Sequence, residues 1–299
     1  MSPKDILKKI RRIELRTRGV IDAAFAGQYR SVFKGRGMNF EEVREYQPGD
    51  EVRAIDWNVT ARLGEVRGDA YVKKFKEERE LTVMLVVDVS ASGEFGSVNL
   101  SKRELAAEVA CVLAFSAVRN NDKVGLLLFS DHVELFVPPK KGRTHTLRVV
   151  REILYFEPKG SGTKPGEALG YLNRVLHRRS VVFLVSDFQA PKFTRELAMT
   201  ARRHDVVALP IIDPREEELP DIGRVTLEDA ETGEQIEINT SSRSARLAFL
   251  RGVEARRNTQ NREFQRLHID SIELRTDEDY VPALRTFFRN RERRMAIPA

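Results

Sequence analysis

The sequence predicts an α/β fold: a doubly wound, mostly parallel central sheet with helices on both faces, plus a small N-terminal β-rich element and an inserted β-hairpin. From residue 81 onward, short β-branched runs alternate with helical patterns, which is typical of parallel strands joined by crossover helices. Polar side chains follow directly on two of these runs, at the strand ends where open α/β sheets bind ligands. Both observations place a candidate site at one edge of the sheet.

The elements follow one another in a regular order. Ser101 and Glu104 form a capping-box pattern at the start of the first helix of this region. Right-handed crossovers place strands 81–88 and 181–186 side by side near the sheet centre. The predicted strands are 81–88, 124–129 with its antiparallel neighbour 132–137, 181–186, 206–212 and 270–274, and the predicted helices are about 101–120, 144–155, 165–177, 193–204, 242–267 and 278–290.

Two regions are expected along the chain. Residues 1–80 contain a basic amphipathic helix over about 1–18, followed by a small β-rich element with glycine and proline turns. Residues 81–299 form the main domain, in which 224–240 alternates apolar and polar residues as a β-hairpin does. We expect this hairpin to decorate the edge of the sheet.

Composition narrows the class of protein. The 299 residues are 41% hydrophobic and 32% charged, with no apolar run long enough for a membrane span. No signal peptide is visible, and the single Cys111 cannot form an internal disulfide, so we expect a cytoplasmic protein. The net charge of +6 gathers near the two ends without interleaved aromatics, which argues against nucleic-acid binding.

The strand ends carry a set of oxygen ligands. Asp88, Ser90 and Ser92 follow the first strand, Asp187 follows the strand at 181–186, and Thr163 opens the helix before that strand. An extended segment would direct the first three side chains to one side. Hydroxyl and carboxylate oxygens suit Mg²⁺ or Mn²⁺, and Ca²⁺ less well. Two carboxylates would leave a water position that an acidic side chain of a protein partner can take. Taken singly, each residue also fits an ordinary turn or helix cap.

The order and spacing of these five residues resemble the metal-ion-dependent adhesion site (MIDAS) of the von Willebrand factor A fold, written as Asp-x-Ser-x-Ser, then Thr, then Asp. In that family the hydroxyls contact the metal and the carboxylates largely hold its waters. Residues 40–57, FEEVREYQPGDEVRAIDW, resemble the hallmark of the bacterial domain of unknown function 58 family. The resemblance covers about residues 20–290 and implies a role with a MoxR-type AAA+ ATPase. Gly93 stands where many relatives carry methionine, which removes no ligand.

A second polar cluster lies within that hallmark. Tyr46, Arg53, Asp56 and Trp57 fit a partner-docking face. They equally fit a structural role, in which Asp50 and Asp56 pair with nearby arginines and Trp57 packs the small element onto the sheet. The sequence leaves both interpretations open.

The expected function is that of a non-catalytic, metal-dependent protein-interaction module that acts with a MoxR-type ATPase in the maturation, assembly or remodelling of other proteins. Membrane-anchored von Willebrand factor A proteins are further candidate partners, which would place the chain at the inner membrane only peripherally. The alternative is a metal-dependent hydrolase or nuclease, and a third possibility is a vestigial site on a scaffold. In 160–164 the lysine follows the threonine instead of preceding it, unlike a phosphate-binding loop, and no Gly-x-Ser-x-Gly elbow occurs.

Overall fold

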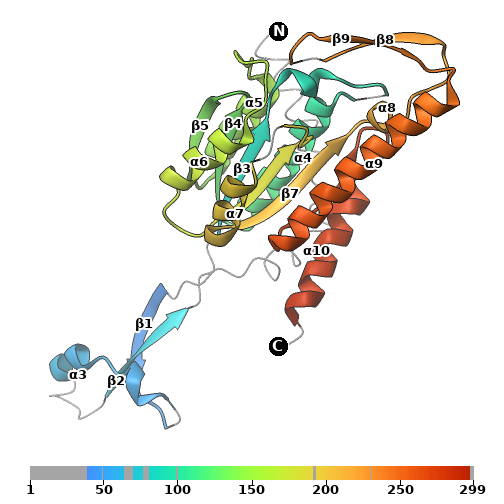
Figure 1. Ribbon diagram of the computed structural model, residues 1–299. Coiled ribbons are helices and arrows are strands. Elements are labelled where there is room, and N and C mark those ends of the chain that lie inside the picture. Colours follow the sequence, from blue (N-terminus) through green and yellow to red (C-terminus); the bar gives the residue numbers. More distant parts are fainter. Residues whose placement is uncertain are drawn as a thin grey trace. The chain divides into compact units, whose positions relative to one another are not determined.

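The computed structural model describes residues 39–48, 50–63, 70–76, 81–98, 100–190, 193–229 and 231–296 (Figure 1). These divide between two compact units, one of residues 34–81 and one that includes Thr82–Ala299. The predicted amphipathic helix at 1–18 lies outside the described residues. Each unit is therefore considered by itself.

The larger unit contains, within its described residues, a seven-stranded sheet. The order is β10-β7-β6-β3-β4-β5, with β11 also pairing with β7. Every pair is parallel except β4 with β5, so the predicted α/β sheet is confirmed. The strands are β3 (Thr82–Asp88), β4 (Lys123–Phe129), β5 (Val133–Lys140), β6 (Val181–Ser186), β7 (Asp205–Ile212), β10 (Asp270–Ser271) and β11 (Leu274–Arg275).

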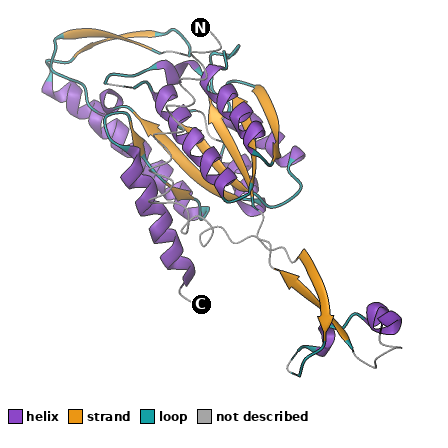
Figure 2. Ribbon diagram, turned by 180° about the vertical axis from the view of Figure 1, so that it is seen from behind, coloured by secondary structure: helices purple, strands orange, loops and turns teal. Residues whose placement is uncertain are grey.

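Helices cover both faces of this sheet (Figures 1 and 2). Because side chains alternate along a strand, Met84 and Val86 of β3 face one layer and Leu85 and Val87 face the other. Met84 and Val86 pack in a core cluster with α6 (Pro165–Val175), α7 (Thr194–Arg203) and Phe264 of α9 (Arg243–Arg266). The remaining described helices of this unit are α4 (Lys102–Arg119) and α5 (Arg143–Tyr155), which contact each other on the opposite face, the short α8 (Pro214–Glu217), and α10 (Tyr280–Ala296).

Of the local features predicted from the sequence of this unit, the helix cap is confirmed and the last strand is not. The Ser101–Glu104 capping box is present at the start of α4, as predicted, and Cys111 is fully buried in that helix. The single strand predicted at 270–274 is instead two short strands, separated by Ile272 and Glu273. Ile272 N still bonds to Ala208 O at 2.9 Å, but Glu273 turns away to pair with Arg257 of α9.

The predicted hairpin is confirmed as β8 (Arg224–Glu228) and β9 (Gln235–Asn239). The two strands form a sheet of their own. In Figures 1 and 2 the hairpin extends over the edge of the main sheet at which the parallel strands end. It is therefore positioned to reach the loops that carry the candidate metal ligands.

The smaller unit is β-rich, as predicted. Strands β1 (Asn39–Glu45) and β2 (Tyr71–Lys76) pair antiparallel, with a short 3-10 helix, η1 (Val52–Ala54), and helix α3 (Trp57–Leu63) between them. The turn after β1 is held by a bidentate ion pair, in which Arg44 Nη1 and Nη2 donate to the Asp50 carboxylate at 2.8 and 2.7 Å. This is one of the pairings that the sequence suggested.

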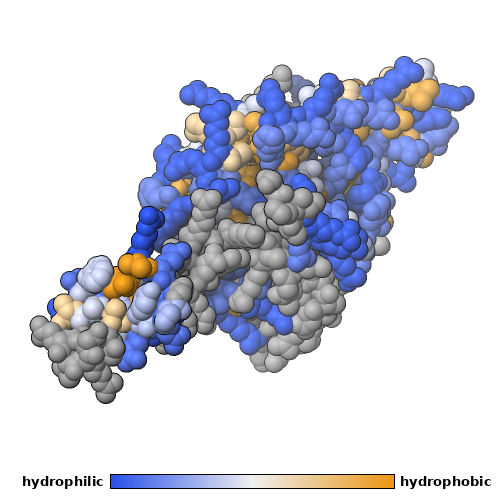
Figure 3. Space-filling view, turned by 90° about the horizontal axis from the view of Figure 1, so that it is seen from below, coloured by the Kyte–Doolittle hydropathy of each residue, from blue (hydrophilic) through white to orange (hydrophobic). Residues whose placement is uncertain are grey.

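The described helices include none that is both long and apolar enough to cross a lipid bilayer. In Figure 3 the described surface on the face seen from below is mostly hydrophilic, with hydrophobic residues in small groups. Contact with a partner on that face would therefore depend on polar and charged groups more than on a large apolar patch.

The buried His204 at the end of α7 makes the stability of the larger unit depend on pH. Burial, with Arg203 and Arg179 nearby, lowers the pKa of His204 from 6.5 to about 4. Its Nδ1 accepts a hydrogen bond from Ser180 N at 3.3 Å, so the folded state holds the ring neutral. Since the unfolded chain binds the proton more readily, the stabilisation is complete above pH 6.5 and is lost as the pH falls from 6.5 toward 4.

We expect the free energy of unfolding of the native protein to fall by about 2 kcal/mol more than that of His204→Gln between about pH 7.5 and pH 5. Urea unfolding at the two pH values measures this difference. If the free energy of unfolding falls equally in the two proteins, His204 binds its proton as readily in the folded state as in the unfolded chain.

Candidate metal centre

The first candidate segment follows β3. Ser90 is extended, with φ −61° and ψ 166°, and the 3-10 turn η2 (Ala91–Glu94) comes directly after it. This turn brings the Oγ atoms of Ser90 and Ser92 to 3.1 Å from each other. The convergence of these side chains was predicted, but from an extended segment. A turn produces it because the strand ends at Asp88.

Asp88 is held between the two central strands. Its Oδ1 accepts from Ser90 N at 3.0 Å, and its Oδ2 accepts from Ser186 Oγ at 2.6 Å. Ser186 ends β6, which pairs with β3 as predicted. Burial and the negative charge of Asp187 raise the pKa of Asp88 to about 6, although the hydrogen bonds from Ser186 and Ser90 oppose the rise. Burial therefore makes the ionised form of Asp88 unfavourable, and a cation beside this carboxyl would stabilise that form.

Asp187 has a partner that the sequence analysis missed. Lys102, in the first turn of α4, is buried, and its Nζ donates to Asp187 Oδ2 at 2.7 Å and to Glu216 Oε1 at 2.6 Å. Burial works to lower the pKa of Lys102, but the two carboxylates outweigh it and raise the pKa. A lysine in the first turn of a helix lies at the unfavourable end of the helix dipole. That position was the available signal that this residue has a specific partner.

The loop after Asp187 has an unusual backbone. Phe188 has φ +56°, a left-handed conformation that is rare for a bulky residue. Its ring packs edge-on against Phe264 at 5.3 Å and stacks on Phe193 at 6.3 Å between centroids. Gln189 N donates to Asp187 Oδ1 at 3.1 Å. The Asp187 carboxylate is therefore held by the Gln189 amide on one oxygen and by Lys102 on the other.

The loop that carries Thr163 is anchored by Glu134 of β5. The Glu134 side chain is buried, and its Oε1 accepts from Ser130 Oγ, Lys159 N and Gly160 N at 2.7, 2.9 and 2.8 Å. Burial works to raise the pKa of Glu134, but these donors outweigh it and lower the pKa. The loop is thus held by an ionised carboxylate that was not among the predicted site residues.

This loop also contacts the first segment and the hairpin. Ala91 N donates to Ser161 O at 3.0 Å, which joins the two loops. Thr163 N donates to Glu231 Oε2 at 3.2 Å, and Thr163 Oγ1 donates to Glu231 Oε1. Glu231 lies in the turn between β8 and β9. No motif in the sequence connects residue 231 with residue 163, so this contact was not predicted.

One small cavity collects four of the five predicted ligands. Asp88, Ser90, Ser92 and Asp187 line it together with Lys102 and Ser186, whereas Thr163 does not line it. The cavity volume is about 20 Å³, enough for one water-sized occupant. Among the described residues no group of three or more His, Cys, Asp or Glu side chains could hold a metal ion. Coordination here would therefore depend on the serine hydroxyls as well as on the carboxylates.

The donor set of this cavity fits a small, hard divalent cation. The carboxylates of Asp88 and Asp187 line the cavity, and the buried ammonium of Lys102 pairs with Asp187 and with Glu216, which does not line it. Burial is the main cause that raises the pKa of Asp88 and of Glu216, so a cation nearby would stabilise the ionised form of each carboxyl. Mg²⁺ or Mn²⁺ would supply that charge through oxygen ligands. Metal binding by these residues stays a prediction.

The second predicted cluster divides by role. Asp56 is buried, and its Oδ1 accepts from Asn58 N at 3.0 Å and Val59 N at 3.3 Å, so it caps α3. Trp57 is 66% exposed and is not a core residue of the small unit. Arg53 is exposed and Tyr46 is partly exposed. Asp56 therefore has a structural role, while the docking role of Tyr46, Arg53 and Trp57 stays a prediction.

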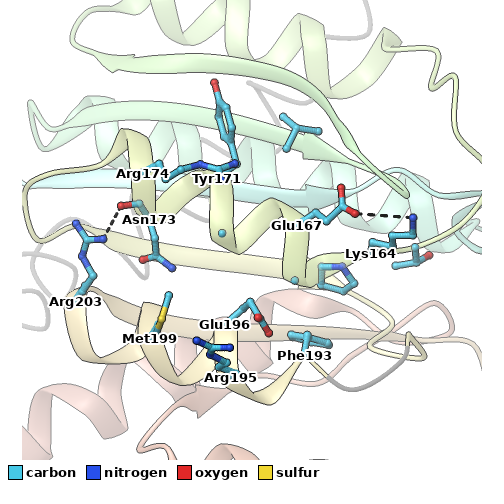
Figure 4. A pocket seen from close by; sticks show the side chains of 15 residues that line it. Lys164, Glu167, Tyr171, Asn173, Arg174, Phe193, Arg195, Glu196, Met199 and Arg203 are labelled. Atoms are coloured by element: carbon cyan, nitrogen blue, oxygen red, sulfur yellow. Dashed lines mark hydrogen bonds and ion pairs between the residues drawn. The ribbon is translucent and has the colours of Figure 1, made fainter.

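A groove between α6 and α7 begins at the Thr163 loop (Figure 4). Its volume is about 1030 Å³. Arg203 Nη1 donates to Asn173 O at 2.5 Å and closes one end, while Lys164 lies 3.9 Å from Glu167 at the other. The side chains that line it are mixed in charge and include Tyr171, Arg174, Arg195, Glu196 and Met199. The surface beside the candidate site is thus hollowed and has both apolar and charged side chains.

Comparison with known proteins identifies the family. The model of the family described as "Protein of unknown function DUF58" matches residues 42–259. The chain belongs to the DUF58 family. A relative from Mycobacterium tuberculosis, "Uncharacterized protein Rv1480", is 33% identical over 287 residues, which cover 95% of this chain and 89% of that protein. The family resemblance inferred from residues 40–57 is therefore confirmed.

Two solved structures are distantly similar to this DUF58 chain. BatB from Bacteroides thetaiotaomicron is 18% identical, and the match covers 72% of this chain and 98% of that chain, with a TM-score of 0.46. The VWA domain of SpRpn10 is 15% identical, and the match covers 44% of this chain and 75% of that chain, with a TM-score of 0.33. The doubly wound α/β architecture of the larger unit is established by its own sheet order and helix layers.

Proposed function

We propose that this DUF58 protein is a non-catalytic protein-interaction module whose binding depends on a divalent cation. The observation that carries the proposal is the single small cavity shared by Asp88, Ser90, Ser92 and Asp187 at the carboxyl ends of β3 and β6. A von Willebrand factor A-like fold by itself suggests an interaction module. The shared cavity adds a defined place for the contact.

Each residue has a role that its contacts support. The hydroxyls of Ser90 and Ser92, 3.1 Å apart, would hold the ion directly. Asp88 already accepts one hydrogen bond on each oxygen, which suits a carboxylate that holds metal-bound water. Asp187, whose carboxylate accepts a hydrogen bond from Gln189 N, would hold a second metal-bound water. The bound cation supplies an electrophilic position that an acidic side chain of a partner can take.

The proposed partner is a MoxR-type AAA+ ATPase, which the family resemblance implies, with membrane-anchored von Willebrand factor A proteins as further candidates. The groove between α6 and α7 begins at Thr163 and would extend the contact beyond the ion. We also propose a cytoplasmic location, because the proposed ATPase partner would be met there. Hydrolysis by a bound cation would need a base beside it, and the described residues that line the cavity include no histidine.

Calorimetric titration with MgCl₂ and MnCl₂ tests the metal site. We expect saturable uptake of one ion by the native protein and at least about a tenfold loss of affinity in Ser90→Ala and Asp88→Ala. Ser161→Ala is the matched control, since Ser161 is exposed and joins the first loop only through its backbone oxygen. Absence of saturable uptake by the native protein would overturn the proposal.

A pull-down with the purified MoxR-type ATPase tests the partner. We expect the native protein to be retained by the ATPase in Mg²⁺, and to be lost in EDTA or when Ser90→Ala replaces it. Equal retention of the protein under all three conditions would show that the cation has no part in docking. Metal-stimulated cleavage of a phosphodiester or peptide substrate by the native protein, abolished in Ser90→Ala, would favour the hydrolase alternative instead.

A further inference from the structure

The turn of the β8–β9 hairpin is built to present one acidic side chain. Asp229 Oδ1 accepts from Glu231 N and Thr232 N, both at 2.8 Å, and Asp229 N donates to Glu234 O at 2.8 Å. Gly233 adopts φ +72°, the left-handed conformation that closes the turn. These bonds fix the backbone at Glu231, so its carboxylate is held in a defined position.

The Glu231 carboxylate lies on the loop of a predicted metal ligand. It accepts from both donors of Thr163, the backbone N at 3.2 Å and the Oγ1 hydroxyl. A Cβ atom at Gly162 would lie 3.7 Å from Glu231 Oε2, so the carboxylate also covers the neighbouring residue. Thr163 itself is buried. An acidic group of the chain thus takes both donors of Thr163, in a loop that joins the Ser90–Ser92 loop through the bond from Ala91 N to Ser161 O.

The hairpin is attached firmly at its base but presents little buried surface along its length. At the base, Thr240 is fully buried and bonds to Gly223 O through both its N and its Oγ1, each at 2.7 Å. Between base and tip the strands are largely exposed, and Ile236 is 62% exposed. With little apolar burial to hold it, the hairpin can move away from Thr163 at low cost in free energy.

We propose that Glu231 is an intramolecular ligand of the metal site, which takes the position of the partner's carboxylate until a partner displaces the hairpin. This rests on the proposed metal-dependent function. The partner's acidic residue then competes with a group already tethered beside the ion. A tethered carboxylate has a high effective concentration, so the free protein would reject isolated carboxylates and accept a partner that also binds the displaced hairpin or the groove.

Mn²⁺ titration followed by water-proton relaxation tests this inference. In the native protein Glu231 fills one coordination position, whereas in Glu231→Gln water fills it, so the relaxivity of bound Mn²⁺ should rise. The affinity for Mn²⁺ should fall by about tenfold. Sodium acetate, as a free carboxylate probe, should lower the relaxivity of Glu231→Gln and leave that of the native protein unchanged.

The controls separate this inference from the proposed function. Glu234→Gln changes an exposed carboxylate in the same turn and should behave as the native protein does. Native protein that takes up no Mn²⁺, or takes it up equally in Ser90→Ala, would overturn the proposed function and this inference with it. Uptake that depends on Ser90 but gives the same relaxivity and acetate response in native protein and Glu231→Gln would overturn this inference alone.

Amide hydrogen exchange gives a second measurement that needs no metal. In the metal-free protein, Glu231→Ala should speed exchange at Thr163 N, because that amide donates to Glu231. Exchange at Gly160 N, which donates to Glu134, should stay unchanged and shows that the variant is folded. An unchanged rate at Thr163 would show that the hairpin does not rest on the site.

Discussion

Replacement of Lys102 by methionine is expected to lower the free energy of unfolding by about 3 kcal/mol in metal-free buffer, because it leaves Asp187 and Glu216 without their buried cation. The methionine fills a similar volume, so the loss of charge dominates the effect. Urea unfolding in EDTA measures the change. The matched control is Lys164→Met, whose side chain is 60% exposed and pairs only loosely with Glu167 at 3.9 Å. It should change the free energy by less than about 0.5 kcal/mol.

The same variant links stability to the metal. If Asp88, Asp187 and the two serines bind a divalent cation, Mg²⁺ or Mn²⁺ replaces the charge that Lys102→Met removed. We therefore expect the ion to stabilise Lys102→Met more than it stabilises the native protein, by mass action at a tighter site. Equal stabilisation of both proteins would show that the ion and the ammonium do not share the same carboxylates.

The part of the site made by the sheet could be predicted from sequence, because strand order follows from general rules. Parallel strands joined by right-handed crossovers placed β3 beside β6, and this brought Asp88 and Asp187 to one cavity. Hydrophobic runs and the Ser101 cap located the helix that follows. These features depend on periodicity and on local hydrogen bonds, both of which are visible in the sequence.

The part made by long-range polar contacts could not be predicted. Lys102, Glu216 and Glu231 reach the site from α4, α8 and the hairpin turn, and neither their spacing nor their neighbours mark them as members of it. Thr163 matches the motif by order, yet its hydroxyl donates to Glu231 and it does not line the cavity. For a charged side chain on an exposed turn, the sequence has no periodic pattern that indicates which residue it will contact.

Loss of the Asp213 carboxylate should have an effect of similar size, because this buried group joins three segments around the site. It lies at the end of β7 and is fully buried. It accepts from Ser97 N and Oγ in the loop before α4, from Arg215 N at 2.9 Å in α8, and from Thr276 Oγ1 at 2.9 Å after β11. Burial works to raise the pKa of Asp213, but these hydrogen bonds outweigh it and lower the pKa.

We expect Asp213→Ala to lower the free energy of unfolding by about 3 kcal/mol, since several donors lose one buried acceptor together. Asp213→Asn keeps the shape and one acceptor oxygen and should lose about half as much. Urea unfolding at neutral pH measures both. Because Asp213 is ionised in the folded state, lowering the pH through its depressed pKa should narrow the difference between the native protein and Asp213→Ala.

Asp213→Ala also tests whether the loops of the site are one unit. Ser97 leads into α4 and Lys102, and Arg215 adjoins Glu216, so the carboxylate ties together both partners in the Lys102–Glu216 ion pair. If the site depends on that tie, Mn²⁺ affinity should fall in Asp213→Ala although no proposed ligand has changed. Native affinity in a destabilised Asp213→Ala protein would instead mean that the β3 and β6 loops hold the cation independently of the segments that surround them.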